Sequence, residues 1–243
     1  MKTVKVGLVG VGTVGRGVVE VLKRNCEEIS RRTGSQIVVV AACARDVEKA
    51  TEFLGPEVKV FNDPLDVVRD DNVDIVIELI GGTTTARTLL LEAISLSKPV
   101  VTANKALIAE CGNELFAQAA ANGSIVAYEA AVAGGIPIIK ALREGLAGNR
   151  IDSVAGIVNG TTNFILSEMR EKGMSFEEAL GDAQRLGYAE ADPTFDIEGI
   201  DAGQKLAIIA AVSFGISIQP EKVYCEGITK LTEADILAAE EFG

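Results

Sequence analysis

The first half of the chain alternates short apolar runs with stretches of helical spacing, and this rhythm restricts the fold more than any other feature. The apolar runs predict strands over residues 4–9, 36–43, 58–61, 73–80, 98–102 and 124–128. Helical spacing lies between several of them, at residues 15–22, 84–96 and 112–122. Strands that alternate with helices form a parallel sheet covered on both faces, with ligand sites at the carboxyl ends of the strands. The expected fold class is therefore α/β, with a doubly wound parallel sheet.

A glycine-rich break at residues 133–137 ends this rhythm and predicts a boundary between two domains, 1–134 and 135–243. The second domain is richer in helix, with a capping box at residues 175–178 and a strongly apolar helix at 200–214. Residues 151–158 and 223–228 have the apolar pattern of strands in a separate sheet, so the second domain is expected to be α+β. A capped helix begins after Thr232, close to the end of the chain, so this domain is expected to be truncated.

A G-x-G-x-x-G pattern directly follows the first strand and opens the first helix. Its residues are Gly10, Val11, Gly12, Thr13, Val14 and Gly15. In this context the first glycine allows a tight turn, the second lets the main chain approach a pyrophosphate, and the third packs helix against strand. The N-terminus of the helix also offers unpaired N–H groups to phosphate. The sequence therefore predicts a Rossmann-type dinucleotide site, the alternative being an ordinary glycine-rich turn.

Two basic residues follow strands at the edge where the cofactor would bind. Arg45 follows the second strand, where a carboxylate would select NAD by binding the ribose 2′-hydroxyl; the arginine favours NADP, although Asp46 beside it leaves NAD possible. Lys105 follows the fifth strand, in Thr-Ala-Asn-Lys, and is expected near the nicotinamide. The alternative for Lys105 is a solvated lysine at a helix start.

Composition excludes several classes of function. The 243 residues contain no histidine, which removes Ser-His-Asp and Cys-His catalysis and histidine metal sites. A net charge of −12 argues against nucleic acid as the main partner. The four cysteines are far apart and fit a reduced, cytoplasmic protein. No apolar run approaches the ~18 residues of a membrane span, so no membrane partner is expected.

The segment from Gly187 to Lys205 is the most informative part of the sequence. Five carboxylates precede one lysine, and Asp201 and Lys205 are four residues apart on one helix face. Carboxylates suit a cationic amine, and a lysine suits an alcohol or carbonyl oxygen. The alternative is a solvated acidic loop with an ordinary helix ion pair, but Lys205 leads into an apolar segment where a charge is costly.

The chain resembles the homoserine dehydrogenase family along its whole length. The matching motifs are the glycine-rich opening, Thr-Ala-Asn-Lys at 102–105, Asn-Gly-Thr-Thr-Asn-Phe-Ile-Leu at 159–166, and the segment from Gly187 to Lys205. The resemblance implies reversible reduction of L-aspartate 4-semialdehyde to L-homoserine with NAD(P)H, in the pathway to threonine, methionine and isoleucine. It also implies a homodimer or larger homo-oligomer. Family chains are longer and often add a regulatory domain, which fits the expected truncation.

The resemblance also assigns roles to residues. Lys205 would be the proton donor, and Lys105 a second lysine at the cofactor and substrate. Glu190 and Asp201 would hold homoserine, Asp196 would be a further substrate-side carboxylate, and Gly187 would lie near the nicotinamide. A sodium ion would be held mostly through carbonyl oxygens of the residues Glu129, Val132, Gly134 and Ile136.

Two other functions compete with this one. A semialdehyde dehydrogenase acting through a thioester needs a cysteine activated by a base, normally histidine, and the chain has none. A non-catalytic, nucleotide-sensing Rossmann module would explain the first half equally well, but it leaves the segment from Glu190 to Lys205 without a purpose.

Overall fold

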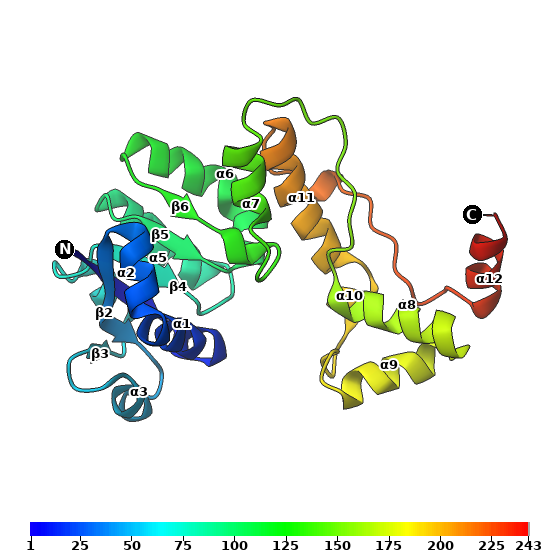
Figure 1. Ribbon diagram of the computed structural model, residues 1–243, viewed down its shortest axis with the longest axis horizontal. Coiled ribbons are helices and arrows are strands. Elements are labelled where there is room, and N and C mark those ends of the chain that lie inside the picture. Colours follow the sequence, from blue (N-terminus) through cyan, green and yellow to red (C-terminus); the bar gives the residue numbers. More distant parts are fainter. Residues whose placement is uncertain (243) are drawn as a thin grey trace. The chain divides into compact units, whose positions relative to one another are not determined.

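The computed structural model describes residues 1–242 and divides the chain into two compact units (Figure 1). The first unit is Met1–Ala141, and the second begins at Leu142. The division lies slightly beyond the glycine-rich break at 133–137, because a short helix, α7 (Ile138–Lys140), is tied back to the first unit. Both carboxylate oxygens of Glu129 accept N–H groups from α7, those of Ile139 at 2.8 Å and Lys140 at 3.0 Å.

The first unit is built on a six-stranded, wholly parallel sheet with the order β3-β2-β1-β4-β5-β6. The strands are β1 (Lys2–Val9), β2 (Ser35–Cys43), β3 (Lys59–Phe61), β4 (Ile75–Glu78), β5 (Val100–Thr102) and β6 (Val126–Ala127). The helices are α1 (Thr13–Arg24), α2 (Cys26–Thr33), α3 (Val47–Leu54), α4 (Pro64–Arg69), α5 (Thr84–Ser95) and α6 (Lys105–Ala121). All six predicted strands and the doubly wound fold are confirmed.

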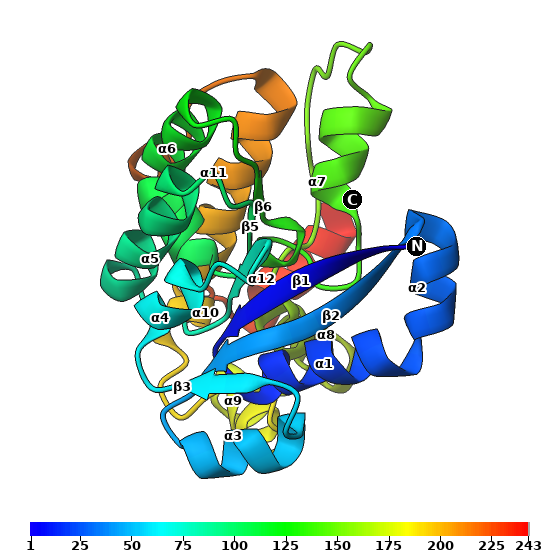
Figure 2. The same ribbon diagram turned by 90° about the vertical axis from the view of Figure 1, so that its left-hand side faces the viewer.

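Helices cover both faces of this sheet, with α1 and α2 on one side and α4, α5 and α6 on the other (Figure 2). The central strand β1 is buried at its carboxyl end, where Leu8 and Val9 are inaccessible to solvent. Leu8 packs with Val19 of α1 and with Ala50 and Leu54 of α3. Both faces of the strands are therefore apolar, which explains why they appear in the sequence as near-continuous apolar runs.

The chain leaves β1 toward one edge of the sheet and returns through β4 on the other side of β1. The turn that follows β1 and the turn that follows β4 therefore lie at the same carboxyl edge, at the point where the strand order reverses. Main-chain hydrogen bonds lock both turns to the sheet, from Gly10 N–H to Cys43 O at 3.1 Å and from Leu79 N–H to Val9 O at 2.8 Å. This is the edge at which doubly wound folds bind ligands.

The second unit is helical in the residues that the structure describes. Its longer elements are α8 (Gly160–Lys172), α9 (Phe176–Arg185), α11 (Ile200–Phe214) and α12 (Glu233–Phe242), with a single turn, α10 (Thr194–Ile197), before α11. The core is formed by α8, α9 and the segment after α9, through Ile165, Met169, Ala179, Ala183, Ala189 and Ile197. The predicted helix at 200–214 is confirmed residue for residue.

The two strands predicted in the second unit are wrong. Residues 151–158 and 223–228 form no ladder with each other or with any other described segment. Their main-chain groups bond elsewhere: Val158 O accepts from Lys205, and Ile228 N–H donates to Ile197 O. Each segment also leaves one large apolar side chain uncovered, with Ile157 79% and Tyr224 83% exposed. An apolar run indicates a strand only where a neighbouring strand is available to pair with it.

Among the described helices, none has both the length and the apolar character needed to cross a membrane.

The capping box of α9 gives a stability prediction. Ser175 Oγ accepts the Glu178 N–H, and the Glu178 carboxylate accepts from the main chain and hydroxyl of Ser175, which holds the pKa of Glu178 below its usual range. Ser175→Ala should lower the free energy of unfolding at pH 7 by about 1 kcal/mol. A carboxyl group with a lowered folded-state pKa stabilises the fold above its ordinary pKa and loses that effect as pH falls through the folded value. The loss on Ser175→Ala, measured by thermal melting, should therefore shrink in acid.

The neighbouring Glu177 is the control for this prediction. It lies in the same first turn and takes no part in the box, so Glu177→Gln should melt close to the parent temperature at pH 7. Equal destabilisation by both substitutions would show that the first turn of α9 depends on its general charge rather than on the box.

Candidate active site

The glycine-rich turn has the three different geometries that a dinucleotide turn requires. Gly10 has φ +106°, and a Cβ there would stand 2.7 Å from Leu79 O. A Cβ on Gly15 would stand 2.0 Å from Gly10 O, so the helix approaches the turn as closely as a glycine permits. Gly12 has open space where its Cβ would be and precedes the first residue of α1. The turn is thus closed on its inner side and open at Gly12.

The N-terminus of α1 is free to bind an anion. Its N-cap is Gly12, which offers no side-chain acceptor, and the first turn holds no acidic residue. The flanking side chains of Thr13 and Val14 are exposed, and Val11 is half-buried. The unpaired N–H groups and the helix dipole therefore favour a phosphate at this point.

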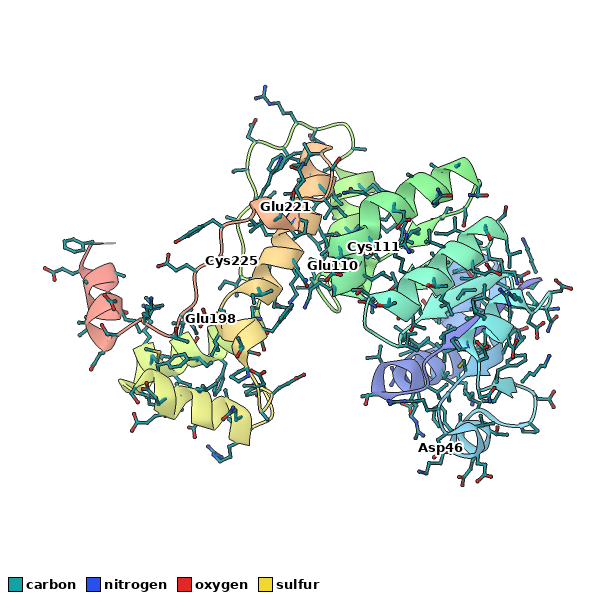
Figure 3. All side chains as sticks on the ribbon, turned by 180° about the vertical axis from the view of Figure 1, so that it is seen from behind. Asp46, Glu110, Cys111, Glu198, Glu221 and Cys225 are labelled. Atoms are coloured by element: carbon teal, nitrogen blue, oxygen red, sulfur yellow. The ribbon has the colours of Figure 1, made fainter. Side chains whose placement is uncertain are left out.

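Arg45 and Asp46 differ in what their side chains do. Asp46, labelled in Figure 3, caps α3: its carboxylate accepts the Lys49 N–H at 3.1 Å and pairs with Lys49 Nζ at 2.9 Å, which lowers the pKa of Asp46. The Arg45 guanidinium is exposed and makes no hydrogen bond or ion pair with residues 1–242. Of the two side chains beyond β2, the arginine is the one left to meet a ligand.

Lys105 is the first residue of α6, at the same carboxyl edge of the sheet. Its neighbour Asn104 caps the helix by accepting the Leu107 N–H at 3.1 Å, and it donates to Gly82 O at 2.7 Å. A cation at a helix N-terminus opposes the helix dipole, which costs a few tenths of a kcal/mol or more. The fold therefore positions this lysine against its local electrostatic preference.

In the second unit, Lys205 and Asp201 form a largely buried ion pair. Lys205 Nζ lies 2.7 Å from Asp201 Oδ2 and donates to Val158 O, also at 2.7 Å. The side chains are 18% and 8% exposed. Asp201 lies in the first turn of α11, where the helix dipole favours a negative charge. Two of the three ammonium hydrogens are thereby engaged, and one is left for another acceptor.

Asn159 joins the carboxylates of this group. It caps α8 by accepting the Thr162 N–H at 2.8 Å, and its Nδ2 donates to Asp196 at 2.7 Å and to Asp201 Oδ2 at 2.9 Å. One neutral amide thus holds two carboxylates beside Lys205. The expected substrate residue Asp196 is half-buried and already has this partner.

Glu190 is presented on an ordered loop between α9 and α10. Thr161 Oγ1 donates to Tyr188 O at 2.8 Å, and Gln184 Nε2 donates to Glu190 O at 3.1 Å. The Glu190 carboxylate is exposed and has no hydrogen bond or ion pair to the described part of the chain. Gly187 starts this loop in the left-handed region, at φ +79°. The structure does not join Glu190 directly to Lys205.

The loop expected to hold sodium lies in the first unit. Both oxygens of the Glu129 carboxylate accept N–H groups of α7, as described above, so main-chain carbonyl oxygens are the donors that remain. Val132 is buried, whereas Gly134 and Ile136 are exposed. Across residues 1–242, no cluster of three or more acidic or cysteine side chains could hold a metal ion.

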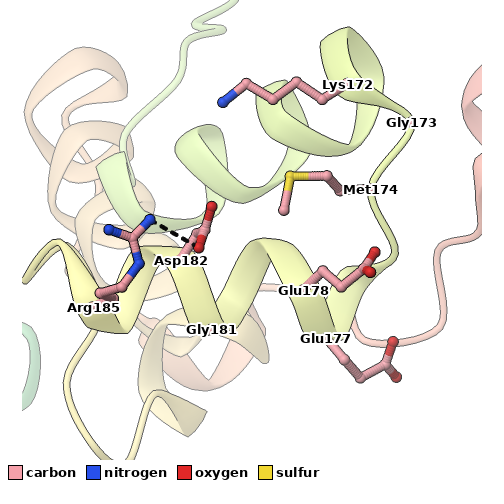
Figure 4. A pocket seen from close by; sticks show the side chains of 8 residues that line it. All are labelled: Lys172, Gly173, Met174, Glu177, Glu178, Gly181, Asp182 and Arg185. Carbon is pink, nitrogen blue, oxygen red and sulfur yellow. Dashed lines mark hydrogen bonds and ion pairs between the residues drawn. The ribbon is translucent and has the colours of Figure 1, made fainter.

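A shallow pocket elsewhere in the second unit contains none of these residues (Figure 4). It lies between the end of α8 and the outer face of α9, and its basic side chains are already paired, Arg185 with Asp182 at 3.0 Å and Lys172 with Glu168. It is not the site predicted from the sequence.

Comparison with known proteins gives one family for both units. Residues 10–129 match the model of the homoserine dehydrogenase NAD-binding domain, and residues 137–243 match the model of homoserine dehydrogenase itself. An archaeal crystal structure from Archaeoglobus fulgidus, which bears the homoserine dehydrogenase name provisionally, is 38% identical with a TM-score of 0.86; the match covers 99% of this chain and 77% of that one. The chain belongs to the homoserine dehydrogenase family.

Two other relatives are more similar and longer. The homoserine dehydrogenase of Pseudomonas aeruginosa is 57% identical over all of this chain and 56% of its own length. The crystal structure of a homoserine dehydrogenase from Thiobacillus denitrificans is 59% identical with a TM-score of 0.94, over 100% of this chain and 56% of that one.

A more distant structure contains a bound cofactor. A hyperthermophilic archaeal homoserine dehydrogenase, solved in complex with NADPH, is 29% identical with a TM-score of 0.80, over 96% of this chain and 76% of that one.

The chain thus spans little more than half the length of the curated family members it matches. Residues 10–129 of its first unit match the NAD-binding domain of the family, as the glycine-rich opening predicted. The non-catalytic module is the weaker alternative, since the second unit matches the homoserine dehydrogenase model as well.

No role of their own was predicted from the sequence for two buried polar residues, Asn159 and Glu78. Asn159 appeared only as part of a motif, although an Asn before a helical segment is a cap signal. Glu78 was passed over inside the apolar run 73–80, although a carboxylate there carries the same signal that singled out Lys205: a charge in an apolar segment.

The glycine turn gives a paired prediction. Gly15→Ala places a methyl group 2.0 Å from Gly10 O, so we expect a loss of about 1–3 kcal/mol or more in stability. Gly12→Ala meets no atom of the chain, so it should melt near the parent temperature and yet weaken NADPH binding at least tenfold, about 1.4 kcal/mol. Thermal melting and titration with NADPH measure both effects. Parent-like NADPH affinity in Gly12→Ala would contradict a pyrophosphate at this turn.

Proposed function

We propose that this chain carries the dinucleotide-binding and catalytic parts of an oxidoreductase that interconverts L-homoserine and L-aspartate 4-semialdehyde. The observation that carries the proposal is the Lys205 ammonium, held by Asp201 and Val158 O beside a second carboxylate, in a chain of this family. The first unit would hold NAD(P)(H) and the second the amino acid. The non-catalytic module offers no reason to bury such an ion pair, whose desolvation is costly.

A bound nicotinamide would supply or accept the hydride, and the chain's own groups would handle the charge on the substrate. Hydride addition to the aldehyde carbon leaves negative charge on oxygen, which needs a proton and a nearby cation. The remaining N–H of Lys205 suits both needs. Asp201 and Val158 O hold the amine in one position, so little reorganisation is required when the charge develops.

The ammonium group of homoserine needs anionic partners, and the carboxylates of the second unit suit it. Glu190 is unpaired among the described residues and is carried by a loop pinned at Tyr188 and at its own carbonyl. Asp201 adds negative charge to the same unit. Asp196 does so too, and Asn159 donates a hydrogen bond to each of these carboxylates. Gly187 would lie near the nicotinamide, as the family resemblance implies.

The exposed Arg45 supports NADP as the preferred cofactor, with NAD possible. A guanidinium beyond β2 can bind a 2′-phosphate, and Asp46, which could instead bind a 2′-hydroxyl, is occupied as a cap. We also propose the sodium ion, through main-chain oxygens of the loop from Glu129 to Ile136, because oxygen donors suit such an ion.

The cellular setting is proposed on similar grounds. The four free cysteines among the described residues fit a cytoplasmic protein. Exposed apolar side chains in the second unit, such as Ile157 and Tyr224, fit a homodimer or larger homo-oligomer.

Two of the four cysteines lie where a thioester nucleophile is disfavoured. Burial raises the pKa of the Cys43 thiol, with Asp63 and Asp66 adding to the shift, and burial also raises the pKa of Cys111. A raised pKa disfavours the thiolate nucleophile that such chemistry requires.

The direct test of the function is NADPH consumption when L-aspartate 4-semialdehyde is added to the protein. Oxidation of NADPH with formation of homoserine supports the proposal. NADPH binding without consumption would favour the nucleotide-sensing module.

Lys205→Ala should remove most of kcat in both directions, by about 10²–10⁴-fold, because the proton donor is gone. NADPH affinity should be nearly unchanged, as Lys205 is not part of the NAD-binding domain. The exposed Lys230 is the control, and Lys230→Ala should keep parent kinetics. Near-normal kcat in Lys205→Ala together with an inactive Lys105→Ala would make Lys105 the proton donor instead.

Arg45→Ala should raise the KM for NADPH far more than the KM for NADH, because only NADPH has the 2′-phosphate. Loss of one charged hydrogen bond corresponds to about 1.5–3 kcal/mol. Steady-state kinetics with both cofactors measure the difference, and Arg31→Ala on α2, which removes a surface pair with Glu28, is the control. Equal changes for the two cofactors would sink the assignment.

A further inference from the structure

Glu78 is a buried carboxylate that the proposed chemistry does not use. It ends β4 at the carboxyl edge of the sheet, and no part of it is exposed. No lysine or arginine among residues 1–242 forms an ion pair with it. A carboxylate buried in this way is costly unless hydrogen bonds hold it, so its partners indicate what it is for.

Both oxygens of Glu78 accept hydrogen bonds, and they reach two different segments. Oε1 accepts the N–H groups of Ile80 at 2.9 Å and Gly81 at 3.2 Å, in the turn that follows β4. Oε2 accepts the hydroxyl of Thr102, the last residue of β5, at 2.6 Å. Thr102 lies directly opposite Glu78 in the parallel register and is itself 1% exposed.

The network continues from Thr102 to the start of α6 and back to the turn. Thr102 Oγ1 accepts the Asn104 N–H at 2.9 Å, and Asn104 Nδ2 donates to Gly82 O at 2.7 Å. Gly81 and Gly82 both have left-handed φ angles, +71° and +69°, which a turn held from two sides can maintain. The next residue after Asn104 is Lys105.

The same turn also touches the dinucleotide turn. A Cβ on Gly10 would stand 2.7 Å from Leu79 O, and the Leu79 N–H donates to Val9 O. Glu78 therefore ties together the turn after β4 and the N-terminus of α6, beside the glycine-rich turn after β1.

We propose that Glu78 is a positioning residue that acts through Thr102 and Asn104 to fix the start of α6 and thereby aim Lys105. The inference rests on the proposed function, since it assigns Lys105 a part in turnover. Glu78 itself would not touch substrate. The buried Glu78 carboxylate accepts hydrogen bonds from three donors, and hydrogen bonds to a carboxylate are strong. These bonds restrict the motion of the turn after β4 and of the start of α6.

Thr102 offers a matched pair of substitutions for the test. Thr102→Val keeps the shape of the side chain and removes the hydroxyl, whereas Thr102→Ser keeps the hydroxyl. We expect Thr102→Val to lower kcat at least tenfold with the Kd for NADPH changed less than threefold, and Thr102→Ser to restore kcat to within about threefold of the parent. Glu78→Gln, which cannot accept the Thr102 hydroxyl at its amide nitrogen, should resemble Thr102→Val.

A double-mutant cycle separates aiming of Lys105 from general loosening. If the network acts through Lys105, adding Thr102→Val to Lys105→Ala should lower kcat by less than twofold beyond Lys105→Ala alone. A full tenfold further loss would overturn the proposal, as would equal kinetics of Thr102→Val and the parent.

Amide hydrogen exchange at Asn104 gives a readout that does not depend on activity. The Asn104 N–H should exchange faster in Thr102→Val and at the parent rate in Thr102→Ser. If the parent binds NADPH and fails to turn over the semialdehyde, the proposed function fails, and the exchange result still reports whether the network holds α6. Parent-like exchange in Thr102→Val would overturn the network in either case.

Discussion

The parallel pairing of β1 with both β2 and β4 is the constraint on which the first unit depends. The chain passes from β1 to β2 on one side and from β4 to β5 on the other, so the turns that follow the adjacent strands β1 and β4 lie next to each other where the strand order reverses. They approach so closely that Gly10 has no room for a Cβ beside Leu79 O, and Gly15 has none beside Gly10 O. The open space at Gly12 and the uncapped N-terminus of α1 result from this packing. The proposed anion site therefore depends on the sheet order as much as on the glycines.

In the second unit, the Lys205 ammonium lies beside the carboxylate of Asp201, and a second carboxylate, that of Asp196, is linked to the same group. One side-chain amide, that of Asn159, joins the two carboxylates. Asn159 donates to Asp196 and Asp201, while the carbonyl oxygen of the preceding residue, Val158, accepts from Lys205. The segment before α8 thus satisfies both signs of charge from adjacent positions.

The sequence was informative where local signals and long-range packing agree. Strands buried on both faces, the capping box of α9 and the apolar helix 200–214 were all predicted, since each depends on a pattern contained within it. The two strands of the second unit were predicted from the same kind of pattern and were wrong, because pairing depends on a partner elsewhere. Helices α2, α3, α4 and α8 were missed, as were the short helices α7 and α10. α4 begins with an Asp-Pro signal and α8 with a capping Asn, so the residues that begin these two were readable.

The candidate site shows the same contrast between contacts that a local sequence pattern predicts and contacts between residues far apart in the chain. Lys205 and Asp201 could be paired from their spacing on one helix, and the structure places them 2.7 Å apart. Asn159 is more than forty positions from Asp201 in the chain, and Thr102 more than twenty from Glu78, so no spacing rule could join them. What the sequence did contain was the anomaly of a charge in an apolar run, which applies equally to Lys205 and to Glu78. Such a charge is retained only where main-chain and hydroxyl groups offset its desolvation. For Lys205 the partners are Val158 O and the Asp201 carboxylate, and for Glu78 they are the N–H groups of Ile80 and Gly81 and the Thr102 hydroxyl, so each buried charge is held by groups from a neighbouring turn or segment.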